Sequence, residues 1–201
     1  MGKLFIRHVM KIGIFGGTFN PIHVGHAIIA NYVIHHCGID KLWLMVSPLN
    51  PFKVQQGEVN DEHRLRMASM VSSKLENVET SAFEFTLPRP SYTVDTLNAL
   101  SQKFPDDEFY LIIGADNWVV FDRWCGHEEL LEKYHVMIYP REGYNIEIPA
   151  KYKHHATAIG APVVEVSSTV IRDELRQLNN MCFYLPDDVY RYILNHKLYL
   201  E

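Results

Sequence analysis

Short apolar segments that stop at glycine, each followed by a stretch of helical character, limit the fold of this chain more than any other feature. Residues 11–15 and 109–113 are such segments, stopped by Gly16-Gly17 and by Gly114. A strand without a regular polar face is typical of a parallel sheet that helices cover on both sides. The sequence therefore predicts an α/β fold with a parallel sheet, helices on both faces and a small helical C-terminal portion.

The other expected elements follow the same alternation. Strands are predicted over residues 41–46, 78–85, 135–139 and 163–166, and helices over residues 24–37, 60–74, 93–103, 168–178 and 187–196. Asn60 is the expected N-cap of the second helix, and Ser168 or Thr169 is that of the fourth. Residues 10–201 suit a single domain, and residues 1–9 are interpreted as an N-terminal extension outside it.

Composition and charge exclude several classes of partner. The 201 residues carry a formal net charge of −5, so no overall basic field attracts nucleic acid. No apolar run approaches the length that spans a bilayer. Cys37, Cys125 and Cys182 lie far apart without a C-x-x-C pair, which indicates a reducing, cytoplasmic environment. The expected partners are small molecules, not nucleic acid or membrane. The sequence leaves the oligomeric state open, and a homo-oligomer is one alternative.

An anion site is predicted where the first strand ends. Residues 16–26 read G-G-T-F-N-P-I-H-V-G-H, so a glycine turn leads from a strand into a helix. Glycines permit close approach of the backbone to a ligand, and the helix start offers unpaired N–H groups and a positive dipole end. His23 and His26 are three residues apart and share one helix face. A zinc site is an alternative for these histidines, but no third ligand has convincing spacing.

A second phosphate site is predicted near the far end of the chain. Residues 166–172 read V-S-S-T-V-I-R, where a strand ends and a helix begins. The first turn of a helix prefers acidic residues, so the permanent cation of Arg172 is unfavourable there for the helix alone. Hydroxyl groups, open backbone N–H groups and a guanidinium together favour a bound phosphate.

The two motifs resemble the signatures of the nucleotidyltransferase superfamily, with H-x-G-H in the first string and S-S-T-x-I-R in the second. Further strings resemble one branch, the bacterial nicotinate-mononucleotide adenylyltransferases. They are Asn50-Pro51-Phe52-Lys53, His63-Arg64-Leu65, residues 90–97 (P-S-Y-T-V-D-T-L), Gly114-Ala115-Asp116, Trp124 and residues 140–144 (P-R-E-G-Y). The resemblance extends from about Lys11 to Leu200 without a large insertion or gap.

The resemblance implies a Rossmann-like fold and an enzyme that joins ATP to nicotinate mononucleotide, giving deamido-NAD and pyrophosphate. The implied ATP contacts are Gly16, Gly17, Thr18, Phe19, His23, His26, Ser167, Ser168, Thr169 and Arg172, of which His23, His26 and Arg172 are the implied catalytic residues. The implied mononucleotide contacts are Lys53, Tyr92, Thr93, Asp116, Trp124 and Arg141, with Arg64 as a further candidate for phosphate. Magnesium is the implied cofactor, held largely by phosphate oxygens and water rather than by a protein site. Cys125 stands where the branch often has an aromatic residue, so no contact of that side chain is carried over.

Other functions remain as alternatives at this point. A sibling transferase for another phosphomonoester, such as phosphopantetheine or nicotinamide mononucleotide, would keep both phosphate motifs. A nicotinamide-dependent oxidoreductase needs the spaced-glycine fingerprint G-x-G-x-x-G, which the sequence lacks. A non-catalytic nucleotide-binding regulator would not need His23, His26 and Arg172 together. No Asp or Glu stands immediately beside Thr93 or Trp124 in the sequence, which predicts a preference for the acid over the amide mononucleotide.

Overall fold

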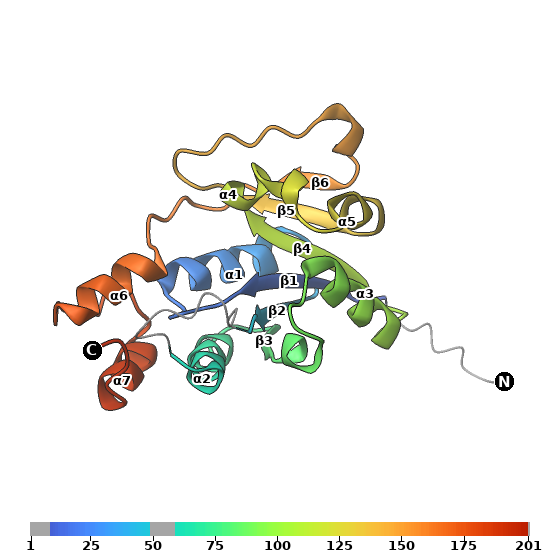
Figure 1. Cartoon of the computed structure of the whole chain (residues 1–201). Coiled ribbons are helices and arrows are strands. Elements are labelled where there is room, and N and C mark those ends of the chain that lie inside the picture. Colours follow the sequence, from blue (N-terminus) through green and yellow to red (C-terminus); the bar gives the residue numbers. More distant parts are fainter. Residues whose placement is uncertain (1–8, 49–58, 201) are drawn as a thin grey trace.

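The computed structural model describes residues 9–48 and 59–200. At its centre lies a sheet of six parallel strands in the order β3-β2-β1-β4-β5-β6 (Figure 1). The strands are β1 (Lys11–Gly17), β2 (Lys41–Val46), β3 (Val78–Ser81), β4 (Glu108–Gly114), β5 (His135–Tyr139) and β6 (Ala156–Ala158). The order reverses at β1, because β2 pairs with one side of it and β4 with the other. In open α/β sheets, ligands bind beyond the carboxyl ends of the strands at such a switch point.

Helices cover both faces of this sheet. The helices of the described residues are α1 (Val24–His36), α2 (Asp61–Ser72), α3 (Thr93–Lys103), α4 (Ala115–Trp118), α5 (His127–Lys133), α6 (Ser168–Arg176) and α7 (Asp187–Asn195), and the 3₁₀ turns are η1 (Phe83–Thr86), η2 (Phe121–Arg123) and η3 (Ala150–Tyr152). Helices α3, α4 and α5 pack in one apolar cluster, and α1, α2, α6 and α7 pack in the other.

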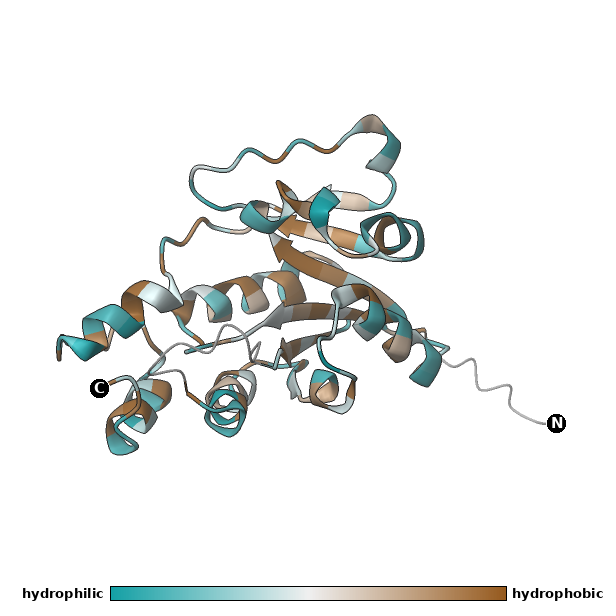
Figure 2. Ribbon diagram, in the orientation of Figure 1, coloured by the Kyte–Doolittle hydropathy of each residue, from teal (hydrophilic) through white to brown (hydrophobic). Residues whose placement is uncertain are grey.

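The strands supply both apolar clusters because neighbouring residues point to opposite faces of a sheet. In β1, Ile12 and Ile14 join the cluster around α3, whereas Phe15 joins the cluster around α1. Figure 2 shows the resulting hydrophobic colouring along the central strands, with polar residues on the outer sides of the helices. The predicted α/β class, with a parallel sheet covered on both faces, is confirmed.

Three predicted features differ from the structure. The strand predicted over residues 163–166 is wrong, because the edge position is taken by β6, where Ala156 pairs with Val136 of β5. The strand predicted over residues 78–85 ends at Ser81, and the chain turns into η1. The N-cap of α6 is Ser167 rather than Ser168 or Thr169, since its Oγ accepts a hydrogen bond from the backbone N–H of Val170 (3.2 Å).

The C-terminal residues form the small helical portion that the sequence predicts. Helix α7 lies beside α2 (Figure 1), and the Tyr192 hydroxyl on α7 is 2.8 Å from Nδ1 of His63 on α2. Beyond α7, the Tyr199 hydroxyl donates a hydrogen bond to Oδ1 of Asn20 (2.6 Å) in the turn after β1. Tyr199 therefore holds the turn of the first motif in position. None of the helices in the described residues combines the length and apolar character needed to cross a membrane.

Candidate active site

The first motif forms the turn from β1 into α1 at the carboxyl ends of the strands. Gly16 and Thr18 are exposed there. The Phe19 side chain is only 2% exposed, and its ring packs edge-on against Phe15 (5.8 Å between centroids) and His26 (5.0 Å). The glycine turn thus presents backbone groups at the surface while Phe19 anchors it in the core. Because the ring of Phe19 is buried, the predicted contact of this residue with ATP can involve only its backbone.

The two histidines stack on one another where α1 begins. Their ring centroids are 3.7 Å apart, and the backbone N–H of His23 donates a hydrogen bond to Nδ1 of His26 (3.3 Å). Because Nδ1 of His26 accepts, a neutral His26 ring carries its proton on Nε2, which is the donor available to a ligand. Gly25 leaves room for this arrangement, since a Cβ at that position would lie 3.0 Å from Nδ1 of His23.

Both histidines are neutral near pH 7. Burial, followed by the charge of Arg141, lowers the pKa of His23 to about 3. Burial, followed by the neighbouring His23 and Arg141, lowers the pKa of His26 well below its ordinary value of 6.5. The pair therefore presents polar hydrogen-bonding groups rather than cations, and an incoming anion would raise both pKa values. Within the described residues, no group of three or more His, Cys, Asp or Glu side chains is placed to hold a metal ion.

The second motif contacts the first directly, although about 150 residues separate them in the sequence. The Ser168 hydroxyl donates a hydrogen bond to the backbone carbonyl of Pro21 (3.0 Å). Nη1 of Arg172 donates to the backbone carbonyl of Asn20 (2.8 Å), and its Nη2 lies 3.4 Å from Oγ1 of Thr169. The N-terminal ends of α1 and α6 are thereby brought together. The N–H groups of Val24 and Val170 already have partners, Tyr184 O and Ser167 Oγ, but the positive dipole ends of the two helices favour an anion between them.

Arg141 and Asp116 lie next to the histidine pair. Asp116 lies in α4, two residues after the end of β4, and Arg141 lies two residues after the end of β5, so both stand at carboxyl ends of strands. Nε of Arg141 is 3.6 Å from Oδ1 of Asp116, and Nη2 of Arg141 is 3.4 Å from the Tyr139 hydroxyl. Arg141 lines a narrow cleft with His23 and His26, and it lines a neighbouring cavity of about 430 Å³ together with Asp116 and Ser167. The structure therefore places these two predicted mononucleotide contacts beside the predicted ATP contacts.

A separate cavity of about 240 Å³ joins the glycine turn to the other predicted mononucleotide contacts. Its polar and aromatic lining comprises Gly16, Gly17, Thr18, Ser47, Glu84, Thr93, Thr96 and Trp124, and its apolar lining comprises Ile14, Leu97 and residues 111–113. The shape and lining suit a flat ring that carries a polar substituent. Ser47 and Glu84 were missed by the sequence reasoning. Ser47 follows a buried strand, a position that signals a site in a parallel sheet, but nothing local marks Glu84.

Three further candidates have different outcomes. Lys53 lies outside the described residues. Tyr92 caps α3 and is 48% exposed, but it is absent from the lining of the cavity that contains Thr93. Arg64 is fully buried, and its guanidinium is bound by the carbonyl oxygens of Thr18 and Ser47 and by the Asp61 carboxylate. The hypothesis that Arg64 contacts phosphate is therefore wrong, since its hydrogen bonds hold the loops after β1 and β2 together.

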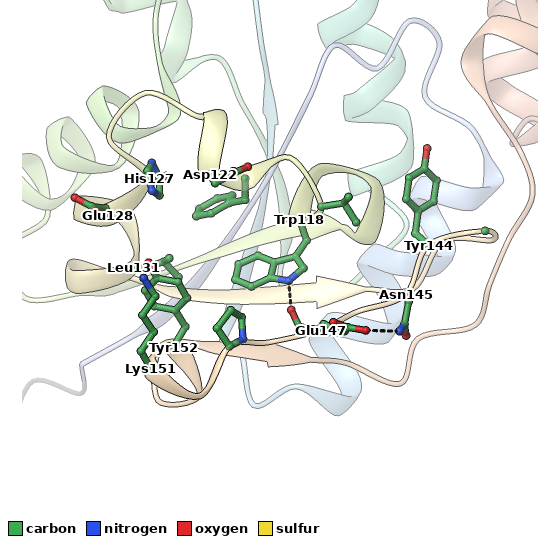
Figure 3. A pocket seen from close by; sticks show the side chains of 14 residues that line it. Trp118, Asp122, His127, Glu128, Leu131, Tyr144, Asn145, Glu147, Lys151 and Tyr152 are labelled. Carbon is green, nitrogen blue, oxygen red and sulfur yellow. Dashed lines mark hydrogen bonds between the residues drawn. The ribbon is translucent and has the colours of Figure 1, made fainter.

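A wider cavity, about 820 Å³, lies apart from both motifs (Figure 3). It opens between α5 and the segment that contains η3, with Trp118, Leu131 and Tyr152 in its lining. Nε1 of Trp118 donates a hydrogen bond to the backbone carbonyl of Glu147 (3.0 Å) there. No residue of either motif lines this cavity, whereas residues of both motifs line the smaller cavities at the carboxyl ends of the strands.

Comparison with known proteins identifies the family. The family model described as "Cytidylyltransferase-like" matches residues 14–196. A "Probable nicotinate-nucleotide adenylyltransferase" of Bacteroides fragilis is 42% identical over 184 residues, which cover 92% of this chain and 91% of the relative. A protein of the same name from Flavobacterium johnsoniae is 41% identical over 193 residues, which cover 94% of this chain and 99% of the relative. The solved "Plasmodium falciparum nicotinic acid mononucleotide adenylyltransferase complexed with NaAD" shares the fold, with a TM-score of 0.81 at 21% identity over 94% of this chain and 97% of that one. Two phosphate motifs in contact at the switch point of a parallel sheet, together with these matches, establish that the chain belongs to the cytidylyltransferase-like family.

Proposed function

We propose that this chain transfers the adenylyl group of ATP to the phosphate of nicotinate mononucleotide, giving deamido-NAD and pyrophosphate. The observation that carries the proposal is the contact between the two phosphate motifs, Arg172 to Asn20 and Ser168 to Pro21, beside a cavity that holds Thr93 and Trp124. The names of the relatives from Bacteroides fragilis and Flavobacterium johnsoniae support the same reaction. The three free cysteines fit a reducing compartment, so we place the reaction in the cytoplasm.

In this proposal, ATP binds where α1 and α6 begin. The backbone of Gly16, Gly17 and Thr18 packs against the nucleotide, and the open N–H groups of both helix starts face its phosphates. The neutral donors of His23 and His26, the hydroxyls of residues 167–169 and the fixed cation of Arg172 surround the triphosphate. Arg172 already uses one nitrogen to hold Asn20, so the guanidinium is oriented before the ligand arrives.

The mononucleotide binds on the other side of the glycine turn. The pyridine ring enters the cavity between Trp124 and the turn, where the indole offers a flat surface for stacking. The Thr93 hydroxyl and nearby backbone N–H groups hold the carboxylate of the ring. Arg141, which faces both the histidine pair and Asp116, is placed to meet the phosphate that will react. Asp116 keeps the Arg141 side chain at the mouth of the cleft.

The chemistry requires positioning and charge neutralisation rather than an activated protein nucleophile. A phosphate oxygen of the mononucleotide attacks the α-phosphorus of ATP in line, the new P–O bond forms, and the bond to the pyrophosphate oxygen breaks. A phosphate monoester is already a nucleophile near neutral pH, so no catalytic base is needed. Arg172 and the Nε2–H of His26 stabilise negative charge as it develops on the transferred phosphoryl group. Magnesium, bound mainly by phosphate oxygens and water, would neutralise the triphosphate.

The test is a pyrophosphate-release assay with ATP and a panel of phosphate acceptors. The panel contains nicotinate mononucleotide, nicotinamide mononucleotide and phosphopantetheine, each at limiting concentration. We expect the highest kcat/KM with nicotinate mononucleotide and a product that co-elutes with deamido-NAD. Highest kcat/KM with phosphopantetheine would instead assign the chain to a sibling reaction, and no release with any acceptor would reject the transferase.

A further inference from the structure

Glu84 brings a carboxyl group into the cavity where the proposed pyridine ring binds. It stands on η1, between β3 and α3, and lines the cavity together with Thr93 and Trp124. The Thr96 hydroxyl donates a hydrogen bond to Oε1 of Glu84 (3.2 Å), and the Ser47 hydroxyl also hydrogen-bonds to this carboxyl group. Within the described residues, no cation forms an ion pair with it.

Glu84 is the one titratable side chain in the lining of this cavity as far as the structure describes the chain. The cations on the elements packed around it have other partners. Arg64 binds the carbonyl oxygen of Ser47, Arg89 pairs with Asp61 (3.4 Å), and Lys103 lies over the ring of Phe83 (5.2 Å). Among nearby acids, Asp95 accepts the backbone N–H of Tyr92 (3.4 Å). Burial raises the pKa of Glu84, and the hydrogen bonds from Ser47 and Thr96 oppose that rise only in part.

We propose that Glu84 sets the choice between the acid and the amide mononucleotide, because its carboxyl group shares the cavity with the substituent of the pyridine ring. Two carboxylates in one site cannot both stay ionised at low cost, so nicotinate mononucleotide binds together with one proton that the two carboxyl groups share. The amide carries no charge, and its NH₂ donates to ionised Glu84. Protonated Glu84 therefore favours the acid, and ionised Glu84 favours the amide. This inference rests on the proposed function.

The consequence is a substrate preference that depends on pH. Where binding of the acid takes up one proton, its affinity falls by up to about tenfold for each pH unit. The phosphate groups of the two mononucleotides titrate alike, so their effect cancels in the ratio of the two kcat/KM values. The ratio of acid to amide should therefore fall as pH rises from 6 to 9.

The experiment measures this ratio in direct competition at limiting ATP for the wild type, Glu84→Gln and Glu132→Gln. The amide introduced by Glu84→Gln keeps an oxygen for Thr96 and Ser47 and offers a permanent NH₂ to the substrate carboxylate. We expect the ratio of this variant to be independent of pH and at least about tenfold above the wild type at pH 8.5. Glu132 is exposed on α5, so Glu132→Gln is the matched control and should follow the wild type. Proton uptake on binding of nicotinate mononucleotide, from calorimetry in two buffers of different ionisation enthalpy, should be lost in Glu84→Gln.

Three results separate the explanations. A wild-type ratio that stays constant from pH 6 to 9 would overturn the inference even if Glu84→Gln did not fold. Equal losses with both mononucleotides in Glu84→Gln would make Glu84 only a structural bridge between the loop after β2 and α3. Absence of pyrophosphate release with either mononucleotide would reject the proposed function itself, which is a different outcome from an unchanged ratio.

Discussion

Replacement of His23 by Asn should make the protein less sensitive to acid. His23 is 3% exposed, and its burial with the charge of Arg141 lowers its pKa to about 3 in the folded state. In the unfolded chain the imidazole returns to its ordinary pKa of about 6.5. Asn is a good N-cap, so His23→Asn keeps the start of α1 while removing the titrating ring.

The size of the effect follows from these two pKa values. A folded-state pKa below the unfolded value means that the unfolded state binds more protons as pH falls. The stabilisation is therefore complete above pH 6.5 and is lost toward pH 3, at about 1.4 kcal/mol per pH unit. Between pH 7.5 and pH 4.5, His23 alone should cost the wild type about 2.6 kcal/mol of unfolding free energy. Most of this loss should be absent in His23→Asn.

Urea unfolding, followed by circular dichroism at half-unit steps from pH 7.5 to 4.5, measures the difference. The control is His154→Asn, the same replacement at an exposed position, which should follow the wild-type curve. Over this range, the unfolding free energy of His23→Asn should rise by about 2.6 kcal/mol relative to that of the wild type as pH falls. If the unfolding free energies of wild type and His23→Asn instead change in parallel, to within about 0.5 kcal/mol, then His23 has the same pKa in the folded and the unfolded state. That result would refute the conclusion that His23 is buried in its neutral form.

Four further predictions concern the proposed reaction and the hydrogen bond between Tyr199 and Asn20. His26→Ala should lower kcat roughly 10²–10³-fold with a much smaller change in ATP binding, because its donor acts on developing charge; near-normal turnover would remove His26 from the mechanism. Arg172→Lys should also lower kcat/KM, since an ammonium lacks the planar fork that reaches the Asn20 carbonyl on one side and a phosphate on the other, and normal steady-state kinetics would contradict this. Tyr199→Phe removes the 2.6 Å hydrogen bond to Asn20 and should lower the unfolding free energy by about 1–3 kcal/mol. An unchanged urea midpoint of unfolding would refute this. Activity should vanish in EDTA and return with magnesium, and metal analysis that finds one tightly bound zinc per chain would revive the zinc alternative.

The sequence alone predicts the fold class and the two phosphate motifs because both are local patterns. Apolar segments that end in glycine predict buried parallel strands, and most helix bounds fall within two residues of those expected. The strand predicted over residues 163–166 is wrong because a short apolar run does not reveal whether a neighbouring strand has a free edge to pair with. Helices α4 and α5 were not predicted, because they are only four and seven residues long.

The chemistry of the site depends on the tertiary structure. Spacing predicts that His23 and His26 share a face, but only burial and the position of Arg141 make them neutral. Sequence motifs suggest that Arg64 meets phosphate, whereas the fold encloses it among three protein partners. Glu84 joins Thr93 and Trp124 in the lining of one cavity from a segment with no recognisable motif. Periodicity and turn chemistry act between near neighbours in the chain, so the sequence determines them; desolvation and Coulomb interactions depend on distances between remote residues, which only the folded chain fixes.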